Sequence, residues 1–548
     1  MKKRVLSLSL VLALACTMLV GCGKDGNDDK KKEKAKDDYQ TYQEKTGTKD
    51  PVTVSWWIMG GNDEYYKYYW SEMKGIQAIE DITGVDIDFQ VASSYDVYLP
   101  MMTAKSYPDV ITAKNLEQYR GRLAAMYKDG VSISLNDLMD EYMPNFSKIV
   151  KKYPTIGRDL RLDDGTYSFV STLYDTENED DRAAASQYGL AIRKDWLEEV
   201  GKEIPTNINE WYDVLSAFKK YDPNQNGLAD EEPVSMASSG WKYFLSAYGI
   251  DDDPINQDGK IVYGFTTEAY KEYLAEMKKW NDEGLISNMF EDTSLEVRQQ
   301  QVTGNKAGAW KADANHFDED DSSSYISLLR QVAPNAEFAA VPWPKTADGY
   351  QWCYSDIAAF SRDTTVITKN AKEHGTDKAA AYLIDYMLSE NGSTYLTWGV
   401  EGESYEVVNG EKKLLDGMND DVDFHGATIK KINTYADPTT VMLPQFGEIS
   451  SFILSNKSKP YVEACKVWSK GDTSYKLSPA CQLTVDQQAE VDKVTEGMKS
   501  YIGKMRQKFI EGKAPLTDYD TYVSQVNNMG ADKYVEIWQN AYDAYQSR

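Results

Sequence analysis

The sequence predicts an α/β protein, because strand-like segments alternate along the chain with segments of helical periodicity. Val52–Met59 is rich in large apolar residues, as expected of a buried strand. Val85–Val91 alternates apolar and polar residues, which is typical of a strand with one buried face. Two shorter strands are predicted at Pro108–Ile111 and Tyr188–Ile192. Strands separated by helices favour parallel sheets, which we therefore expect.

Three helices between or after these strands have clear start signals or a clear apolar face. Asn207 and Glu210 have the spacing of a capping box, which begins a helix. Tyr270–Trp280 repeats apolar residues on one face. Thr484 and Gln487 have capping-box spacing at the start of a long helical segment.

Length and charge limit the classes of function. The body of the chain, Pro51–Arg548, is too long for one hydrophobic core, so two or three domains are expected. The net charge of −27 becomes −30 if Lys2, Lys3 and Arg4 are removed with a leader. Such an acidic chain is a poor partner for nucleic acid. Its 39 tyrosines and 13 tryptophans suit both ordinary cores and the recognition of sugar rings.

The N-terminus reads as a bacterial lipoprotein signal peptide over residues 1–21. A cationic start precedes the apolar run Val5–Val20, and Leu19-Val20-Gly21-Cys22 has the form of a lipobox. The alternative is an uncleaved transmembrane helix, but the run is shorter than the roughly 20 residues that span a bilayer. We expect cleavage before Cys22, lipid attachment to Cys22, and display on the extracellular face of the cell membrane through that anchor.

Residues 22–50 are expected to be a disordered, charged tether. Acidic and basic residues are balanced there, and the segment has almost no apolar side chain to bury. Among the remaining cysteines, Cys353, Cys465 and Cys481, the last two could form a disulfide, and three free thiols are the alternative.

A polar loop after the helix that begins near Asn207 has the pattern of a calcium site. Hard oxygen donors stand at the spacing that Ca²⁺ needs, with Gly227 at the sharp sixth position. The side chains are Asp222, Asn224, Asn226 and Asp230, with the backbone carbonyl of Leu228 between them. The twelfth position is Pro233 rather than an acid, so the pattern departs from an EF-hand. The alternative is an Asx-rich turn that ends the helix.

Four separated segments resemble one protein family in the same order. They are Arg193–Pro233 (RKDWLEEVGKEIPTNINEWYDVLSAFKKYDPNQNGLADEEP), Tyr395–Gly410 (YLTWGVEGESYEVVNG), the stretch LSPACQLTVDQQAEVDKV, and the closing MRQKFIEGKAPLTDYDTYV with MGADKYVEIWQNAYDAY. Together with the lipobox, they resemble the large Gram-positive subgroup of solute-binding lipoproteins of carbohydrate ABC importers. That subgroup is related to oligosaccharide- and alginate-binding receptors.

The resemblance implies a two-lobed, periplasmic-binding-protein-like fold with an interlobe cleft and crossover hinge segments. It implies an N-terminal lobe from residues 51–175 and 351–435, and a C-terminal lobe from residues 176–350 and 436–548, with the calcium loop at 222–233. It also implies a structural Ca²⁺ whose shell is completed by Glu231. The expected partners are a carbohydrate ligand and the permease subunits of the importer, and we expect a monomer.

For the sugar site, aromatic residues near predicted strand ends are the candidates, since ring faces stack on the C–H faces of sugars and acids accept hydrogen bonds from hydroxyls. The candidates are Trp57, Trp241, Trp310, Trp352, Asp356, Trp398 and Glu401. Each tryptophan could equally be an ordinary core residue.

Two other classes of function are alternatives to a transport receptor. A surface adhesin that binds polysaccharide without a transporter is the alternative. A glycosidase is the less favoured alternative. The number of acidic residues does not exclude it, because the two catalytic carboxylates of a glycosidase are identified by the distance between them in the folded structure. We expect no catalytic activity, since the sequence has no zinc, nucleophile-elbow or P-loop motif.

Overall fold

The computed structural model describes residues 39–61, 63–286, 294–346, 349, 351–354, 358–438 and 442–548. The signal peptide, Cys22, the first part of the tether and Asp356 lie outside these residues. From Gln40 to Arg548 the chain forms one unit of mutually packed elements.

The last part of the predicted tether is folded, which corrects the prediction of disorder up to residue 50. Helix α1 (Tyr42–Thr46) has a complete capping box between Thr41 and Glu44. Tyr42 is buried, and the side chain of Gln43 donates a hydrogen bond to the carbonyl of Gly84 (2.7 Å). A buried aromatic ring and long-range hydrogen bonds thus attach this polar segment to the body, a tertiary effect that composition does not report.

The strands form two main sheets and three hairpins. The five-stranded sheet has the order β2-β1-β3-β10-β4 and contains β1 (Val52–Met59), β2 (Val85–Ala92), β3 (Val110–Ala113), β4 (Val170–Leu173) and β10 (Phe360–Ile367). The three-stranded sheet has the order β8-β5-β9 and contains β5 (Tyr188–Arg193), β8 (Ala309–Asp313) and β9 (Phe338–Val341). The hairpins are β6 (Ile255–Gln257) with β7 (Lys260–Val262), β11 (Tyr405–Val408) with β12 (Glu411–Leu414), and β13 (Asp421–Phe424) with β14 (Ala427–Lys430).

The expected parallel pairing holds in only part of the structure. β1 pairs in parallel with β2 and β3, but β10 is antiparallel to both β3 and β4. In the second sheet β5 is antiparallel to both of its neighbours, so the prediction of a parallel sheet is wrong there. Strand direction depends on the path of long connections, which the alternation of helices and strands does not specify.

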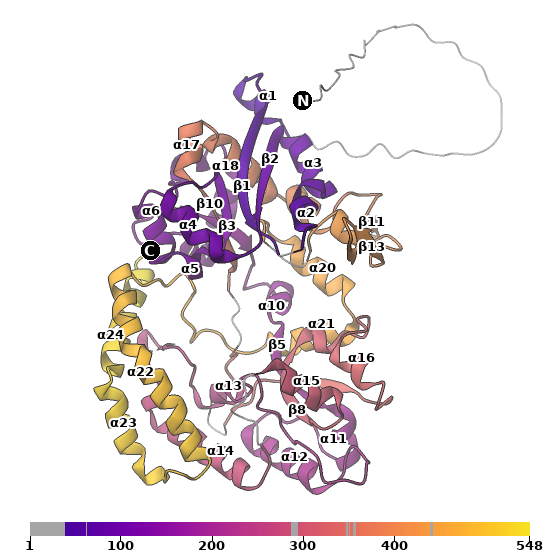
Figure 1. Cartoon of the computed structure of the whole chain (residues 1–548), viewed down its shortest axis with the longest axis vertical. Helices are drawn as coiled ribbons and strands as arrows, with labels where there is room; N and C mark the ends of the chain where they lie inside the picture. The colour runs from indigo at the N-terminus through magenta and orange to yellow at the C-terminus, as the bar shows by residue number, and fades with distance from the viewer. Residues whose placement is uncertain are drawn as a thin grey trace, which may run out of the picture. The chain divides into compact units, whose positions relative to one another are not determined.

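The helices surround both sheets (Figure 1). Those before residue 200 are α1, α2 (Tyr66–Glu72), α3 (Lys74–Thr83), α4 (Tyr98–Ala104), α5 (Asn115–Gln118), α6 (Arg122–Lys128), α7 (Asn136–Met139), α8 (Pro144–Lys152), α9 (Pro154–Asp159), α10 (Glu179–Ala185) and α11 (Lys194–Val200). Those after it are α12 (Ile208–Lys220), α13 (Lys242–Leu245), α14 (Glu268–Asp282), α15 (Leu295–Thr303), α16 (Tyr325–Leu329), α17 (Lys369–His374), α18 (Asp377–Met387), α19 (Glu390–Thr397), α20 (Glu448–Asn456), α21 (Lys459–Trp468), α22 (Val485–Ile510), α23 (Tyr519–Asn528) and α24 (Ala531–Gln546).

The predicted helix starts are confirmed, with one change in detail. Thr484 and Gln487 form the reciprocal capping box of α22. Asn207 caps α12 by accepting from Glu210 N, but the carboxylate of Glu210 turns to Thr206 N (2.7 Å) instead of completing the box. Tyr270–Trp280 presents its apolar residues as the buried face of α14.

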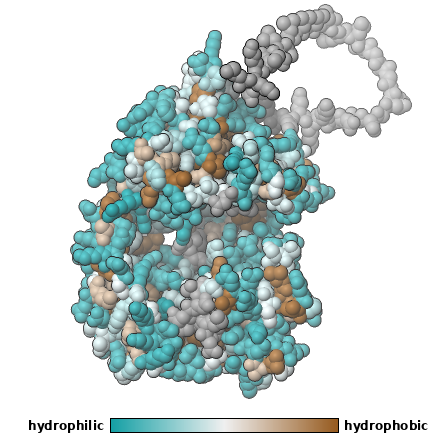
Figure 2. Space-filling view, viewed as in Figure 1, coloured by the Kyte–Doolittle hydropathy of each residue, from teal (hydrophilic) through white to brown (hydrophobic). Residues whose placement is uncertain are grey.

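Each main sheet has its own buried core. In the first, the indole of Trp56 donates a hydrogen bond to the side chain of Thr112 on the adjacent strand β3 (2.9 Å), and α18 is buried from Ala379 to Met387. In the second, Trp310, Phe317 and Trp468 belong to one apolar cluster. The view in Figure 2 is mostly hydrophilic, in keeping with the high charge. Within the described residues, no helix combines the length and apolarity needed to span a bilayer.

Candidate functional site

A cavity of about 690 Å³ lies at one edge of the five-stranded sheet. Its volume falls in the range of ordinary ligand pockets, roughly 300–1,000 Å³. It is lined by residues that follow β3 and β4, by the start of β10, and by the C-terminal helices. The polar and aromatic lining residues are Glu117, Arg122, Tyr174, Gln187, Tyr188, Asp251, Asp253, Phe360, Ser361, Arg362, Lys476, Ser478, Gln488, Asp492, Thr495, Lys499, Tyr534 and Trp538.

Strand direction explains why these residues meet. Because β10 runs antiparallel to β3 and β4, its first residue, Phe360, pairs with Leu173 at the end of β4. Thr364 pairs with Ala113 at the end of β3. The carboxyl ends of β3 and β4 and the amino end of β10 therefore share one edge, which is where ligands bind in open α/β sheets.

The cavity offers aromatic surface on two sides. Tyr188, the first residue of β5, is 46% exposed, although its neighbours on the strand are buried. Trp538 on α24 is half-buried and lines the cavity beside buried Tyr534. An exposed ring face in a concave site can stack on an apolar ligand surface while the rest of the ring stays packed.

Most charges in the cavity form pairs. The pairs are Arg362 with Glu117 (3.3 Å), Lys476 with Asp251 (3.1 Å) and Lys499 with Asp253 (3.3 Å). Asp492 accepts a hydrogen bond from Gln488 (2.7 Å). Such a lining presents both donors and acceptors with little net charge, which suits a ligand rich in hydroxyl groups.

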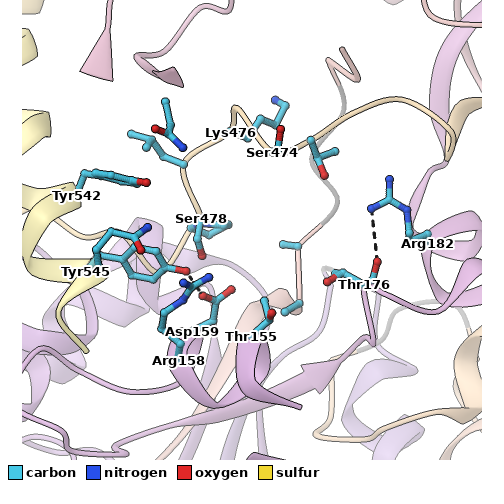
Figure 3. Close-up of a pocket in the computed structure, with 17 residues that line it drawn as sticks. Thr155, Arg158, Asp159, Thr176, Arg182, Ser474, Lys476, Ser478, Tyr542 and Tyr545 are labelled. Carbon is cyan, nitrogen blue, oxygen red and sulfur yellow. Dashed lines mark hydrogen bonds between the residues drawn. The ribbon is translucent and has the colours of Figure 1, made fainter. Parts of the chain in front are cut away.

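A second, smaller cavity of about 270 Å³ adjoins the first (Figure 3). The segment from Lys476 to Pro479 and Ala358 line both cavities, so this segment stands at their boundary. In the small cavity, Tyr545 donates a hydrogen bond to buried Asp159, and Arg182 donates to the carbonyl of Thr176 (3.4 Å). Burial raises the pKa of Asp159.

One face of α24 serves both cavities. Tyr534 and Trp538 line the larger cavity, and Tyr542 and Tyr545 line the smaller one. These residues recur at helical spacing, so they lie on the same side of the helix. The helical spacing of these aromatic residues is a signal of this face that is present in the sequence itself.

The calcium-type loop is ordered by its own side chains. The carboxylate of Asp222 accepts from the backbone N–H groups of Asn226 (3.2 Å) and Gly227 (2.7 Å). The side-chain oxygen of Asn226 accepts from Leu228 N (2.7 Å). Gln225 and Gly227 both have positive φ, 56° and 76°, so the chain turns sharply where the pattern requires it.

The donor set of the loop fits a hard cation. Glu231 is 5% exposed, and its Oε1 atom has no hydrogen-bond partner among the described residues. Burial, followed by the nearby charges of Asp222 and Asp230, raises the pKa of Glu231. A bound cation would offset the repulsion between these carboxylates and would give the Oε1 atom of Glu231 a partner. Asp230 instead contacts the amide of Asn226 (2.9 Å) and Lys306 (3.1 Å).

Within the described residues, the acids of this loop included, no group of three or more His, Cys, Asp or Glu side chains is placed closely enough to hold a metal. Cys353, Cys465 and Cys481 are buried, and Cys465 and Cys481 form no disulfide with each other in this structure. Burial raises the pKa of both Cys465 and Cys481 to about 12.

The tryptophans proposed from sequence lie away from both cavities. Trp310 and Trp398 are 0% and 1% exposed and pack in apolar clusters, so in this conformation they have no ring face to offer a ligand. Their burial corresponds to the core-packing alternative. Trp57 packs edge-on against Tyr98, Trp352 stacks on Tyr475, and Trp241 is covered by the guanidinium of Arg506 at 3.4 Å.

The GxEG-like segment forms a turn. Ser404 Oγ donates to the carbonyl of Trp398 (2.6 Å) and accepts from Val400 N (2.8 Å), while Glu401 is exposed and does not line either cavity. The sequence reasoning missed Tyr188, Arg122 and Trp538. The prediction rests on tryptophans that follow strands, whereas these residues stand at a strand start or on helices.

The chain is similar to substrate-binding proteins of ABC transporters. It is 24% identical over 490 residues to the fructooligosaccharide ABC transporter substrate-binding protein FusA of Streptococcus pneumoniae, covering 86% of this chain and 87% of that protein. It is 22% identical over 561 residues to the polygalacturonan/rhamnogalacturonan-binding protein YtcQ of Bacillus subtilis, covering 99% of each. No family model matches.

Solved structures share the fold. The alginate-binding protein AlgQ2 without calcium ion superposes with a TM-score of 0.63 at 20% identity, covering 90% of this chain and 99% of that one. An EF-hand mutant of FusA in complex with fructo-nystose gives 0.64 at 21% identity, with the same coverage. The fold is therefore that of two-domain solute-binding proteins, which confirms the predicted fold class.

Proposed function

We propose that this chain is the substrate-binding component of a carbohydrate ABC importer, which captures an oligosaccharide and delivers it to membrane permeases. The observation that carries the proposal is the larger cavity, with ring faces from Tyr188 and Trp538 beside paired charged groups. Relatives of similar length carry the names of fructooligosaccharide- and polygalacturonan-binding proteins.

The lining suggests how a sugar would be held. The rings of Tyr188 and Trp538 would stack on C–H faces, and the paired acids and bases would exchange hydrogen bonds with hydroxyl groups. We propose that residues 51–175 with 351–435 and residues 176–350 with 436–548 are the two lobes, and that closure between them desolvates the sugar. Binding and closure require no bond making, so we propose no catalytic activity.

A lipid on Cys22 would hold the protein at the extracellular face of the membrane, near its permeases. The apolar run and the lipobox-like residues before Cys22 support this part of the proposal. One relative that is 22% identical over 556 residues, from Bacillus subtilis, is named lipoprotein LipO.

The loop from Asp222 to Glu231 would hold a structural Ca²⁺. Asp222, Asn224, Asn226, Asp230 and Glu231 would supply side-chain oxygens, and Leu228 its carbonyl. When bound, the ion would supply positive charge that offsets the repulsion of Glu231 by Asp222 and Asp230. The loop also reaches the body, since Asn224 donates to the carbonyl of Asn305 (3.1 Å) and buried Arg193 donates to the side chain of Asn305 (2.6 Å).

The proposal is tested by a thermal-shift screen against neutral and acidic oligosaccharides, followed by calorimetry. A ligand that binds the native state raises the melting temperature. We expect at least one oligosaccharide to bind and to remain chemically intact after incubation. The proposal fails if none binds, and release of shorter sugars would point to a glycosidase instead.

A further inference from the structure

Arg122 differs from the other cations of the larger cavity, because no described residue forms an ion pair or a side-chain hydrogen bond with it. The other three cations each have a carboxylate within 3.3 Å, namely Arg362 with Glu117, Lys476 with Asp251 and Lys499 with Asp253. Arg122 thus brings into the cavity a guanidinium without a directly paired carboxylate, although the charges of Asp253 and Glu117 act on it at longer range.

The surroundings of Arg122 make this charge unfavourable without a ligand. Its side chain is half-buried, and burial lowers its pKa. A buried charge without a partner costs free energy, whereas a hydrogen-bonded counter-ion offsets that cost. The site therefore favours the arrival of an anion.

The backbone holds Arg122 in an unusual conformation. Its φ is 58°, in the left-handed region that costs a residue with a Cβ about 1–2 kcal/mol. The preceding Gly121 has φ 80°, and a Cβ there would lie 2.3 Å from Val485 Cγ2 at the start of α22. Close packing between α6 and α22 thus fixes the turn from which the guanidinium reaches the cavity. Residues kept in such conformations cluster at binding sites.

We infer that Arg122 binds a carboxylate of the ligand and selects acidic oligosaccharides, those that contain uronic acid, over neutral ones. The inference rests on the proposed function. The guanidinium presents a planar pair of N–H donors that matches the two oxygens of a carboxylate. The aromatic and paired polar groups around it would hold the sugar rings, and Arg122 would form an ion pair with the carboxylate of the sugar.

The test compares acidic ligands with neutral ones, and the galacturonate trisaccharide with its methyl ester is the pair matched in everything except charge and the added methyl groups. Calorimetry is run with trisaccharides of galacturonate, guluronate and mannuronate, with the methyl ester of the galacturonate trisaccharide, and with neutral kestose and xylotriose. We expect an acidic trisaccharide to bind at least tenfold more tightly than its neutral counterpart, because a charge-assisted hydrogen bond contributes about 1.5–3 kcal/mol. The preference should weaken as salt is raised.

Variants assign the preference to this residue. Arg122→Gln should abolish the preference for the acidic ligand, and Arg122→Lys should retain part of it because the charge stays and the planar fork is lost. Arg120→Gln is the matched control, since Arg120 is exposed and outside the cavity. Without ligand, Arg122→Gln should melt no lower than wild type, whereas a merely structural role would lower the melting temperature.

The outcomes separate the inference from the proposed function. If neutral trisaccharides bind and Arg122→Gln leaves affinity unchanged, the inference is overturned and the proposed function stands. If an acidic ligand binds equally well to wild type and Arg122→Gln, the inference is also overturned. If no oligosaccharide of either class binds, the proposed function falls and the inference falls with it.

Discussion

The hydroxyl of Tyr545, near the end of the chain, donates a hydrogen bond to the buried carboxylate of Asp159, 386 positions earlier. The guanidinium of Arg158 lies over the same ring, 4.9 Å from its centre. The last helix is therefore joined to α9 through a polar contact inside the smaller cavity (Figure 3). This contact also sets the position of the helix that carries Trp538.

Tyr545→Phe should lower the free energy of unfolding by about 1–3 kcal/mol, because Asp159 would lose a donor while remaining buried. Urea unfolding at pH 7.5 measures the change. Tyr542→Phe is the matched control, since Tyr542 lines the same cavity on the same helix. Equal stability of the two variants would show that the contact contributes nothing.

Trp538→Ala should weaken binding of the best oligosaccharide by about thirtyfold or more, the effect of losing an aromatic anchor worth 2 kcal/mol. Trp310→Ala should instead lower stability by about 3–5 kcal/mol, because it leaves a hole in a core. Calorimetry and urea unfolding on both variants separate the two effects. Wild-type affinity in Trp538→Ala would place the ligand elsewhere.

Asp222→Ala combined with Asp230→Ala should abolish the rise of melting temperature on addition of Ca²⁺, because two anionic ligands are lost. Melting curves with Ca²⁺ and with a chelator provide the measurement. The control is Asp86→Ala with Asp88→Ala, two exposed acids on β2. A calcium response that survives in the first double variant would contradict the site.

His316 should make stability depend on acidic pH. Burial, aided by Arg298 and Lys311, lowers the pKa of His316 to about 3, and its Nδ1 accepts from Trp310 Nε1 (3.3 Å). The unfolded chain takes up this proton below about pH 6.5, whereas the folded chain does not. The stabilisation is therefore complete above pH 6.5 and is lost as the pH falls towards 3.

Urea unfolding at pH 7.5 and 5.0 tests this linkage. The side chain of His316→Asn keeps a hydrogen-bond acceptor but does not titrate. Between pH 7.5 and 5.0 the free energy of unfolding of this variant should therefore fall by about 2 kcal/mol less than that of wild type. His374→Asn, a change at an exposed histidine, should retain the contribution of His316. Identical pH slopes in wild type and His316→Asn would refute the assignment.

Cys22→Ala should release the protein from the membrane or leave it as an unprocessed precursor, because the acyl chains and the cleavage signal depend on that thiol. Cell fractionation with N-terminal sequencing provides the measurement. Cys16→Ala, within the predicted signal peptide, is the control and should leave anchoring intact. Membrane retention of Cys22→Ala with the wild-type N-terminus would refute the lipobox interpretation.

Local patterns in the sequence were enough to predict several elements closely. Val52–Met59 is a strand over its full predicted length, and the capping box of Thr484 and Gln487 begins α22. The reason is that strand alternation, helix caps and sharp turns depend on neighbouring residues. The same holds for the loop at Asp222, whose side chains hydrogen-bond to the backbone within a few positions.

Only the tertiary structure decided which residues form the cavity. Tyr188, Arg122 and Trp538 lie on β5, α6 and α24, three segments far apart in the sequence, yet they line one cavity. The antiparallel direction of β10 places Phe360 at the same sheet edge as the ends of β3 and β4, and the packing of α22 on Gly121 fixes the turn before Arg122. Burial also distinguishes Trp310, which packs in a core, from Trp538, which lines the cavity. The local sequence does not distinguish them, because a tryptophan near a strand or on a helix can occupy either kind of place. Strand direction, long-range packing and burial arise from contacts between distant residues, which one-dimensional patterns do not contain.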